Sequence, residues 1–200
     1  IEVATFRSSR SNPTSKKGMV LRDNFYGSLK DDVFRRDFTI NGLYFDVKNS
    51  QVIDYVGGLE DLKKLQINMI GNPSERFEED PVRMIRAVRF KAKLNATINA
   101  KLNNSISQNA HLIANVPPAR LYEEVIKLFH NESSLVVFRE LSNLGILKYL
   151  FPYTQEDAFI SASLINTSER IKTGNSVTPA FLFAVFLWSA QNKRFNEINK

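Results

Sequence analysis

The chain has 200 residues, of which 43 % are hydrophobic, and its 27 basic and 21 acidic side chains give a formal charge of +6. This composition excludes a disordered chain and a small disulfide-stapled protein, and the length allows one large or two small domains. The lack of cysteine excludes disulfides, thiol catalysis and thiolate metal sites, and it favours a reducing, cytoplasmic compartment. The positive charge fits either a polyanionic partner or a surface that merely keeps the protein soluble.

The N-terminal residues 1–6 combine branched and aromatic side chains, which predicts a strand, and they lack the basic head and apolar stretch of a signal peptide. Because no initiating methionine precedes them, the chain is expected to begin within a domain. The polar residues 8–18 predict a mobile loop. The longest apolar run, 180–188, is well short of the ~20 residues of a membrane-spanning helix, so it predicts a buried helix and no membrane partner.

The segment up to Gly71 has the pattern of a mixed α/β fold. Two apolar runs, 43–47 and 52–56, flank a short polar connection, which predicts a β-hairpin. Gly57-Gly58 is predicted to end the second strand of this hairpin. A helix over 59–65 and a strand over 66–70 are predicted after it.

The hydrophobic period then becomes helical. Asp80 is a good N-cap residue and Pro81 suits the first helical position, so a helix is predicted from here to Leu94. One side of its helical wheel is apolar, and the other is polar and mostly basic. The polar side carries Glu79, Arg83, Arg86, Arg89 and Lys93. The same start signal recurs before 119–129 and before 180–188 and predicts a helix over each, and a further helix is predicted over 133–144.

A first candidate site lies just ahead of the hairpin, where Arg35-Arg36-Asp37 precedes Asn41. If this segment forms a helical turn, Asp37 and Asn41 lie four residues apart on one face and together can bind the hydroxyl groups of a sugar. Arg36 can then hold a phosphate through a fork of charged donors. The alternative interpretation is a capped helix with a solvated basic end and a weak surface ion pair.

A second candidate site combines Glu79 and Asp80 with Arg83 and Arg86, and the helical spacing places Glu79 and both arginines on one face. An arginine locked by carboxylates offers fixed donors and an aspartate offers a fixed acceptor, as hydrogen-bonded recognition of a nucleobase requires. The alternative is an ordinary helix N-terminus, where acidic residues suit the helix dipole and pair with arginines one turn further on.

Other titratable residues carry weaker indications. Glu2 is an acidic residue within the first predicted strand and is interpreted as facing outward. His111 and His130 lie far apart in the sequence beside apolar helices, and they are interpreted as structural or surface residues rather than metal ligands. Asp31-Asp32 is assigned to a loop.

These clusters and the segments around them resemble the class II nucleotidyltransferases, the family that holds tRNA CCA-adding enzymes and bacterial poly(A) polymerases. Four strings carry the resemblance across most of residues 19–152, in the family's order and spacing: RRDFTIN at 35–41, DYVGGLEDL at 54–62, IGNPSERFEEDPVRMIRAVRF at 70–90 and VPPARLYEEVIKLF at 116–129. The last string, together with TPAFLFAVFLW at 178–188, is more similar to bacterial poly(A) polymerases than to CCA-adding enzymes.

The resemblance implies an α+β fold in which part of a nucleotidyltransferase palm, a mixed β-sheet head, precedes an all-α neck and body. We therefore expect the C-terminal part of the head over 1–71, a helical neck that binds nucleotide and RNA over 72–152, and the start of a helical body over 153–200. The DYVGG segment resembles the element that links head and neck, whose glycines are expected to allow a hinge motion.

The resemblance also implies how the nucleotide is bound. From the RRDxxxN segment, Arg36, Asp37 and Asn41 are expected to contact the ribose of the incoming nucleotide. From the EDxxR segment, residues are expected to act as a protein template that hydrogen-bonds the base in place of a nucleic-acid strand. These residues are Glu79, Asp80 and Arg83, with Arg86 as a further nucleotide-binding residue.

The expected RNA contacts and acidic residue follow from the same resemblance. Arg89 and Lys93, on the basic face of the predicted helix, are expected to bind the RNA backbone. Glu2 matches the strand that brings a third acidic residue towards the metal site, and it is the one catalytic candidate in this sequence.

The implied reaction is nucleotidyl transfer, in which an RNA 3′-hydroxyl attacks the α-phosphate of ATP and pyrophosphate leaves. Two Mg²⁺ ions are expected to activate the attacking oxygen and neutralise the leaving group. The family holds these ions mainly with a DxD pair on an earlier strand, and this sequence lacks that pair. We therefore expect an active full-length enzyme and an inactive 200-residue chain; Mg²⁺-dependent AMP addition by the chain alone would contradict this.

Three functional hypotheses follow. The first is template-independent polyadenylation of RNA 3′ ends, the second is CCA addition to tRNA, and the third is a non-catalytic RNA-binding module. Unstructured RNA and a tRNA lacking its CCA end, each supplied with ATP or CTP, separate the first two, whereas a DxD pair encoded upstream dismisses the third. The sequence leaves open the RNA targets and whether the chain self-associates.

Overall fold

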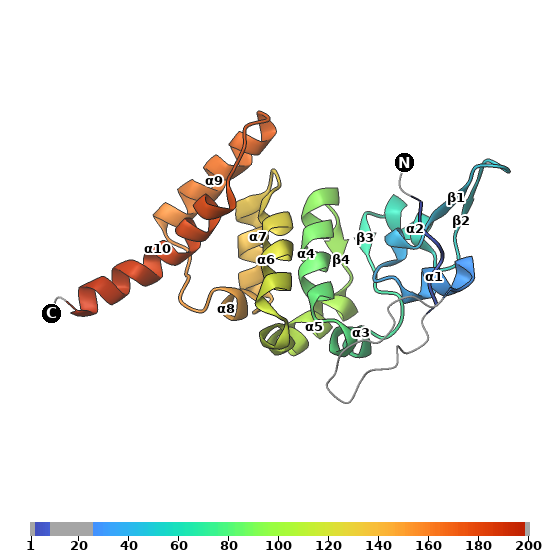
Figure 1. Ribbon diagram of the computed structural model, residues 1–200, viewed down its shortest axis with the longest axis horizontal. Coiled ribbons are helices and arrows are strands. Elements are labelled where there is room, and N and C mark those ends of the chain that lie inside the picture. Colours follow the sequence, from blue (N-terminus) through green and yellow to red (C-terminus); the bar gives the residue numbers. More distant parts are fainter. Residues whose placement is uncertain (1–2, 9–25, 199–200) are drawn as a thin grey trace. The chain divides into compact units, whose positions relative to one another are not determined.

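The computed structural model describes residues 3–8 and 26–198 of the chain (Figure 1). The chain divides into two compact units, one up to Asn72 and one from Pro73 onward. Glu2 and nearly all of the loop expected over 8–18 lie outside the described residues. Among the helices of the described part, none has the length and apolar character needed to span a membrane.

The first unit contains short helices and strands. Its elements in chain order are α1 (Leu29–Arg35), the 3-10 turn η1 (Thr39–Asn41), β1 (Tyr44–Asp46), β2 (Gln51–Ile53), α2 (Gly58–Lys63) and β3 (Gln66–Ile67). Strands β1 and β2 pair antiparallel with Phe45 opposite Val52, so the predicted hairpin is confirmed with shorter strands than expected. Asp46 fixes the hairpin turn, because its carboxylate accepts the backbone N–H of Lys48 at 2.9 Å and the side-chain amide N–H of Asn49 at 2.6 Å.

The strand predicted over residues 1–6 is wrong for the described residues 3–6, which belong to no strand. The pairing seen next to them is a hydrogen bond from the Gly27 N–H to the Phe6 carbonyl at 3.0 Å and an isolated bridge between Arg7 and Tyr26. Branched side chains favour extended backbone, but a strand also needs a partner along its length. Val3 is 90 % exposed, so its apolar side chain is not used for packing.

Asp31 and Asp32 lie in helix α1 and not in the expected loop. Ser28 begins this helix with a capping box: the Asp31 N–H donates to the Ser28 hydroxyl at 3.2 Å, and the Asp31 carboxylate accepts the Ser28 N–H at 2.8 Å. The Ser28-x-x-Asp31 spacing is the sequence signal that predicts such a start. The helix buries Asp32 to 3 % exposure, which gives that carboxylate an unexpected role below.

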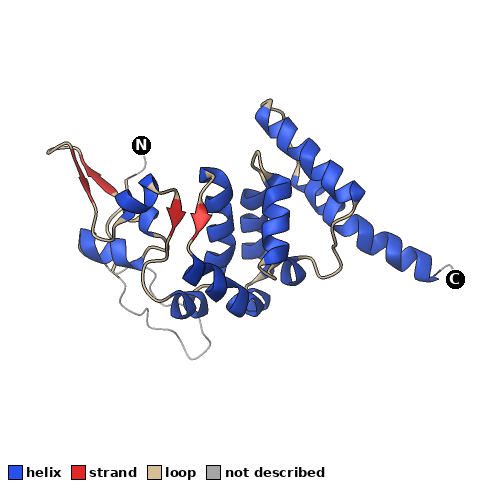
Figure 2. Cartoon of the chain, turned by 180° about the vertical axis from the view of Figure 1, so that it is seen from behind, coloured by secondary structure: helices blue, strands red, loops and turns tan. Residues whose placement is uncertain are grey.

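Over residues 73–198 the regular elements are helices and the short strand β4 (Thr97–Ile98), joined by loops, as Figure 2 shows. The helices are α3 (Pro73–Glu79), α4 (Val82–Leu94), α5 (Ala100–Asn109), the 3-10 helix η2 (Ala110–Asn115), α6 (Pro118–Phe129), α7 (Ser134–Asn143), α8 (Leu147–Leu150), α9 (Ala158–Lys172) and α10 (Pro179–Ile198). Helices α6 and α7 confirm the predictions over 119–129 and 133–144, and α10 extends the one over 180–188. The expected α+β class is confirmed.

The helix predicted to start after Asp80 begins at Val82 and ends at Leu94. Pro81 is its N-cap residue, one position later than predicted, and Asp80 holds the first turn because its Oδ1 accepts the Val82 N–H and its carbonyl the Arg83 N–H, each at 3.2 Å. Helix α3, which was not predicted, ends just before it at Glu79. The Asp80-Pro81 step thus separates two helices and places Glu79 and Arg83 on different ones.

A cluster of phenylalanine rings forms part of the core of the second unit. The ring of Phe186 in α10 lies 4.7 Å from that of Phe129, 6.1 Å from that of Phe138 and 4.4 Å from that of Phe151. All four side chains are buried, and each contributes roughly 1.5–3 kcal/mol by leaving water. The cluster therefore ties α6, α7 and α10 together.

Candidate functional site

The structure brings Asp37 and Asn41 together, although not through the helical turn on which their predicted contact depended. Asp37 is 7 % exposed, and its Oδ1 accepts the Asn41 side-chain amide at 2.8 Å and the Phe38 N–H at 3.0 Å. Asn41 lies in the 3-10 turn η1, so the contact forms across an extended residue and a tight turn and not along an α-helix. The result is a carboxylate and an amide held in fixed mutual orientation.

Arg36 turns its guanidinium toward groups of its own unit. Its Nη1 donates to the Asn41 carbonyl at 3.0 Å, its Nη2 to the Tyr44 hydroxyl at 2.6 Å, and its Nε to Asp32 Oδ2 at 3.1 Å. Its guanidinium carbon also lies 4.9 Å from the centre of the Tyr44 ring. These contacts hold the backbone of the turn that carries Asn41.

Asp32 is the centre of this network, and sequence reasoning missed it because it was assigned to a loop. Its Oδ1 accepts Arg35 Nε at 2.8 Å and the Arg7 N–H at 3.1 Å, while its Oδ2 accepts Arg36 and the hydroxyl of Tyr44. Burial alone raises the pKa of this carboxyl, but the hydrogen bonds from Tyr44, Arg35, Arg7 and Arg36 outweigh it and hold the pKa far below its ordinary value. Asp32 is therefore a carboxylate throughout the physiological range.

The DYVGG segment forms a loop closed by one carboxylate. Asp54 Oδ1 accepts the N–H groups of Val56, Gly57 and Gly58 at 2.9–3.1 Å, and its Oδ2 accepts that of Leu59 at 3.0 Å. Burial raises the pKa of Asp54, and the four backbone donors lower it by more, so the net pKa lies below the ordinary value. Gly57 and Gly58 each occupy a position that favours glycine, for different structural reasons.

These reasons are backbone conformation and close packing. Gly57 has φ +78°, a left-handed conformation that side chains disfavour. Gly58 lies against η1, where an added Cβ would be 2.2 Å from the Thr39 carbonyl oxygen. The Thr39 hydroxyl in turn donates to Asp61 of α2 at 2.6 Å. The glycines and Thr39 therefore fix the turn beside Asn41.

In the second unit, Glu79 joins two arginines. Its Oε2 accepts Arg76 Nη1 and Arg83 Nη1, each at 2.7 Å, and Arg83 Nη1 also donates to the Arg76 carbonyl at 2.7 Å. Both arginine side chains are 14 % exposed. Burial raises the pKa of Glu79, and its bonds and proximity to the two arginines lower it by more, so it stays ionised. Arg76, which was not singled out from the sequence, belongs to this cluster.

Asp80 has a partner that the sequence did not reveal. Its Oδ2 accepts Arg120 Nη2 at 2.6 Å, and Arg120 comes from the first turn of α6, 40 residues further along the chain. With Oδ1 on the Val82 N–H, both carboxylate oxygens are held in place. The segment from Glu79 to Arg83 therefore presents one guanidinium and one carboxylate whose orientations are fixed by neighbours.

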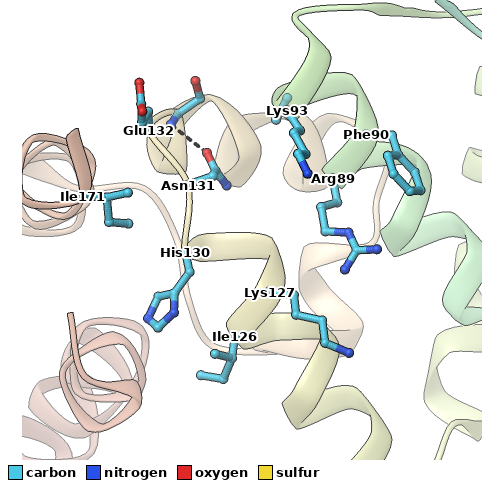
Figure 3. Close-up of a pocket in the computed structure, with 11 residues that line it drawn as sticks. Arg89, Phe90, Lys93, Ile126, Lys127, His130, Asn131, Glu132 and Ile171 are labelled. Atoms are coloured by element: carbon cyan, nitrogen blue, oxygen red, sulfur yellow. Dashed lines mark hydrogen bonds between the residues drawn. The ribbon is translucent and has the colours of Figure 1, made fainter. Parts of the chain in front are cut away.

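Arg86, Arg89 and Lys93 follow on α4 without forming one continuous exposed stripe. The guanidinium groups of Arg86 and Arg89 lie 5.9 and 5.2 Å from the centre of the Phe90 ring. Arg89 and Lys93 line a pocket shown in Figure 3, whereas Arg86 does not. Arg86 and Arg89 therefore share a contact with Phe90, and Arg89 and Lys93 share the pocket.

Within residues 3–8 and 26–198, no group of three or more His, Asp or Glu side chains lies close enough together to hold a metal ion. Glu2, the expected acidic residue, is outside this range.

Comparison with protein families identifies two parts of the chain. Residues 1–68 match the model of the poly(A) polymerase head domain. Residues 95–157 match the model described as the probable RNA and SrmB-binding site of polymerase A. The first match contains the Arg36 to Asn41 cluster, and the second contains Arg120 and most of the helices packed on α4.

Whole relatives show the same likeness. Poly(A) polymerase I of Salmonella typhi is 44 % identical over 94 % of this chain, and a CCA-adding enzyme of Limosilactobacillus reuteri is 39 % identical over 70 % of it. The chain spans 44 % of the first relative and 35 % of the second. The crystal structure of the Bacillus stearothermophilus CCA-adding enzyme in complex with CTP is 32 % identical, covers 72 % of this chain and 35 % of its own, and superposes with a TM-score of 0.61. The chain belongs to the class II nucleotidyltransferase family, which holds the poly(A) polymerases and the CCA-adding enzymes.

Proposed function

We propose that the full-length protein transfers AMP from ATP to the 3′ ends of RNA without a template. The observation that carries this proposal is the alignment of a poly(A) polymerase I with 94 % of the chain at 44 % identity. In the reaction the RNA 3′ oxygen bonds to the α-phosphorus, the bond from that phosphorus to pyrophosphate breaks, and the hydroxyl proton is released. Because the chain spans 44 % of that relative, the activity is assigned to the full-length protein.

Asp37 and Asn41 are proposed to bind the ribose of the incoming ATP. Their mutual hydrogen bond of 2.8 Å uses one amide N–H of Asn41 and leaves that side chain's second N–H and its carbonyl outside the bond. Sugar hydroxyls both donate and accept, so a fixed carboxylate and amide suit them. Arg36 is proposed to hold this turn through the Asn41 carbonyl, in addition to any contact with the nucleotide.

Arg83 and Asp80 are proposed to read the base, with Glu79 fixing Arg83. Adenine presents an amino donor beside a ring-nitrogen acceptor, which matches an aspartate acceptor and an arginine donor. Little side-chain entropy of Arg83 is lost when the base binds, because Arg83 is already held by Glu79 and by the Arg76 carbonyl, each at 2.7 Å. Cytosine presents the same donor and acceptor order, so this pair alone does not separate ATP from CTP. Arg86 is proposed as a further nucleotide-binding residue on the same helix.

The reaction is proposed to use Mg²⁺ and to take place in the cytoplasm. The metal ions would activate the attacking oxygen and neutralise pyrophosphate. Since the described residues hold no suitable ligand cluster, the roles proposed for this chain are confined to binding the nucleotide and the RNA. The absence of cysteine accords with a reducing compartment.

CCA addition is the second candidate, because a CCA-adding enzyme aligns with 70 % of the chain at 39 % identity. The deciding assay supplies the full-length protein with unstructured RNA or with tRNA lacking its CCA end, and with ATP or CTP. Long A tails on unstructured RNA are expected. Incorporation of CTP confined to tRNA would overturn polyadenylation in favour of CCA addition.

The role of Arg83 is tested in the same assay. With GTP and UTP added as competing nucleotides, Arg83→Ala is expected to reduce the preference for ATP over GTP and UTP more than it reduces RNA affinity. Arg139→Ala removes the same charge from an exposed pair with Glu156 and is the matched control, for which no change is expected. An equal loss for all nucleotides with Arg83→Ala would contradict the base-reading role.

A further inference from the structure

A pocket of about 770 Å³ lies within the second unit, between α4, α6, the turn that joins α6 to α7, and α9 (Figure 3). Its volume is in the range of sites that bind small molecules or single residues of a polymer. Four segments that are distant in the sequence supply its walls, and the family match for RNA binding omits the residues from α4 and α9. The two sides of the pocket differ in chemistry.

One side of the pocket is cationic. Arg89 and Lys93 come from successive turns of α4, and Lys127 comes from α6 (Figure 3). Glu124, which is 8 % exposed, lies between two of these cations, with Arg89 Nη1 at 3.5 Å and Lys127 Nζ at 3.3 Å. Three cations and this one carboxylate leave a local charge of +2, which the exposed Glu132 at the turn reduces to +1. This side is therefore suited to an anion.

The other side is apolar and carries an imidazole ring. Ile126 and Ile171 line it, and the His130 side chain extends between them in Figure 3. His130 itself is exposed, so its ring is available to a ligand. The chemistry of this side suits a flat, largely apolar group such as a nucleobase.

The backbone around His130 is held in place. The His130 N–H donates to the Ile126 carbonyl at 2.9 Å, which completes the last turn of α6. Asn131 accepts the Ser133 N–H at 2.6 Å and donates to the Leu128 carbonyl, so its amide joins the two helix ends. The ring of His130 is therefore presented from a fixed turn, which lowers the ordering cost of binding.

We propose that this pocket binds one nucleotide unit of single-stranded RNA, with its phosphodiester on Arg89, Lys93 and Lys127 and its base on His130. The inference rests on the proposed function, which supplies RNA as the substrate, and adds a defined subsite for the strand. A nucleotide in a single strand offers an anion and an unstacked base together, as the two sides of the pocket require. Inorganic phosphate satisfies one side only, and duplex RNA keeps its bases stacked inside the helix.

The experiment measures binding of a short fluorescent single-stranded RNA to the 200-residue chain by anisotropy, over a series of salt concentrations. Lys127→Ala is expected to lower the slope of log affinity against log salt by about 0.7, the value for one phosphate contact on a single strand. Lys172→Ala is the matched control: both lysine side chains are 52 % exposed, and both pair with a glutamate three residues earlier. Since Lys172 does not line the pocket, its loss is expected to leave the slope unchanged.

His130→Ala tests the base-binding side. Loss of one stacked base is expected to weaken binding of the single strand by about 5-fold or more, and to leave binding of an abasic strand unchanged. Inorganic phosphate and duplex RNA are expected to compete poorly. The side chains changed are exposed, and circular dichroism of each variant checks that it is folded.

Several results would overturn the subsite. Equal salt slopes for Lys127→Ala and Lys172→Ala would remove the phosphate contact, and undiminished binding by His130→Ala would remove the base contact. Displacement of RNA by free AMP at comparable affinity would reassign the pocket to a free nucleotide. If the pocket variants bind RNA as tightly as the unmodified chain, the subsite fails while polyadenylation stands; if the full-length protein adds no AMP to RNA, the proposed function fails instead.

Discussion

Replacing Asp32 with asparagine is expected to destabilise the first unit by about 2–3 kcal/mol. Removing one partner of a buried ion pair costs about 3–5 kcal/mol, and the value is reduced here because Arg35 and Arg36 are 34 % and 37 % exposed and water partly solvates them. The side-chain N–H groups of asparagine would also face the Arg36 and Tyr44 donors, whose hydrogen bonds the Asp32 carboxylate accepts. The Asn41 turn, which Arg36 holds, is expected to loosen with it.

The pH dependence gives the sign of the effect. Because the pKa of Asp32 is lower in the folded than in the unfolded protein, its stabilisation is fully present above the unfolded value near 3.8 and is lost as the pH falls toward the folded value. Asparagine does not titrate. The difference between the original chain and Asp32→Asn is therefore expected to be largest near neutral pH and to shrink below about pH 4.

Urea unfolding followed by hydrogen exchange of peptides from residues 26–72 is the suitable assay, because the helices of the second unit dominate circular dichroism. Glu60→Gln is the control in the same unit: its side chain is 60 % exposed and pairs with Lys64 at 3.1 Å, so a change within about 0.5 kcal/mol is expected. A loss for Asp32→Asn no larger than this, or a difference that stays constant down to pH 3, would refute the electrostatic argument.

Four further substitutions test the loop and the core by urea unfolding. Asp54→Asn is expected to cost about 1 kcal/mol, since the carboxylate accepts four backbone N–H groups; no change would contradict its role in closing the loop. Gly58→Ala is expected to lower the free energy of unfolding by about 3 kcal/mol, because the added Cβ clashes with the Thr39 carbonyl. Gly57→Ala is expected to lower it by about 1 kcal/mol through its φ of +78° alone. A larger loss for Gly57→Ala than for Gly58→Ala would refute the close packing of Gly58 against Thr39. Phe186→Ala is expected to cost about 3–5 kcal/mol by emptying the ring cluster, and a loss below 1 kcal/mol would contradict that core.

Local patterns predicted the hairpin and five of the ten α-helices in the described part of the chain, namely α2, α4, α6, α7 and α10. Helices α6 and α7 begin and end within about one residue of the predicted bounds, because apolar spacing, and for α6 a proline start signal, are properties of the segment itself. The Asp37–Asn41 contact was expected from a helical turn, and it forms instead across the 3-10 turn η1. The prediction of a strand over residues 3–6 failed because pairing depends on a partner that the segment does not contain.

The partners of the candidate residues were beyond the reach of sequence patterns. Asp80 meets Arg120 from 40 residues away, and Glu124 of α6 lies beside Arg89 of α4. Nothing in the local spacing relates these residues, because each pair forms only when α4 packs on α6. Asp32 lies in a helix where a loop is predicted, because the capping box between Ser28 and Asp31 begins a helix there.

The sequence by itself determined the family, the mixed α+β class and the residue types available for binding a nucleotide, since these depend on local strings and composition. The tertiary structure decided which of those residues act together. In the folded chain Arg36 donates to Asp32, and Glu79 fixes Arg83. Arg89 and Lys93 line a pocket that His130 also lines. Charge on a helix face is a property of one segment, whereas a pocket needs walls from several segments, and only packing brings those together.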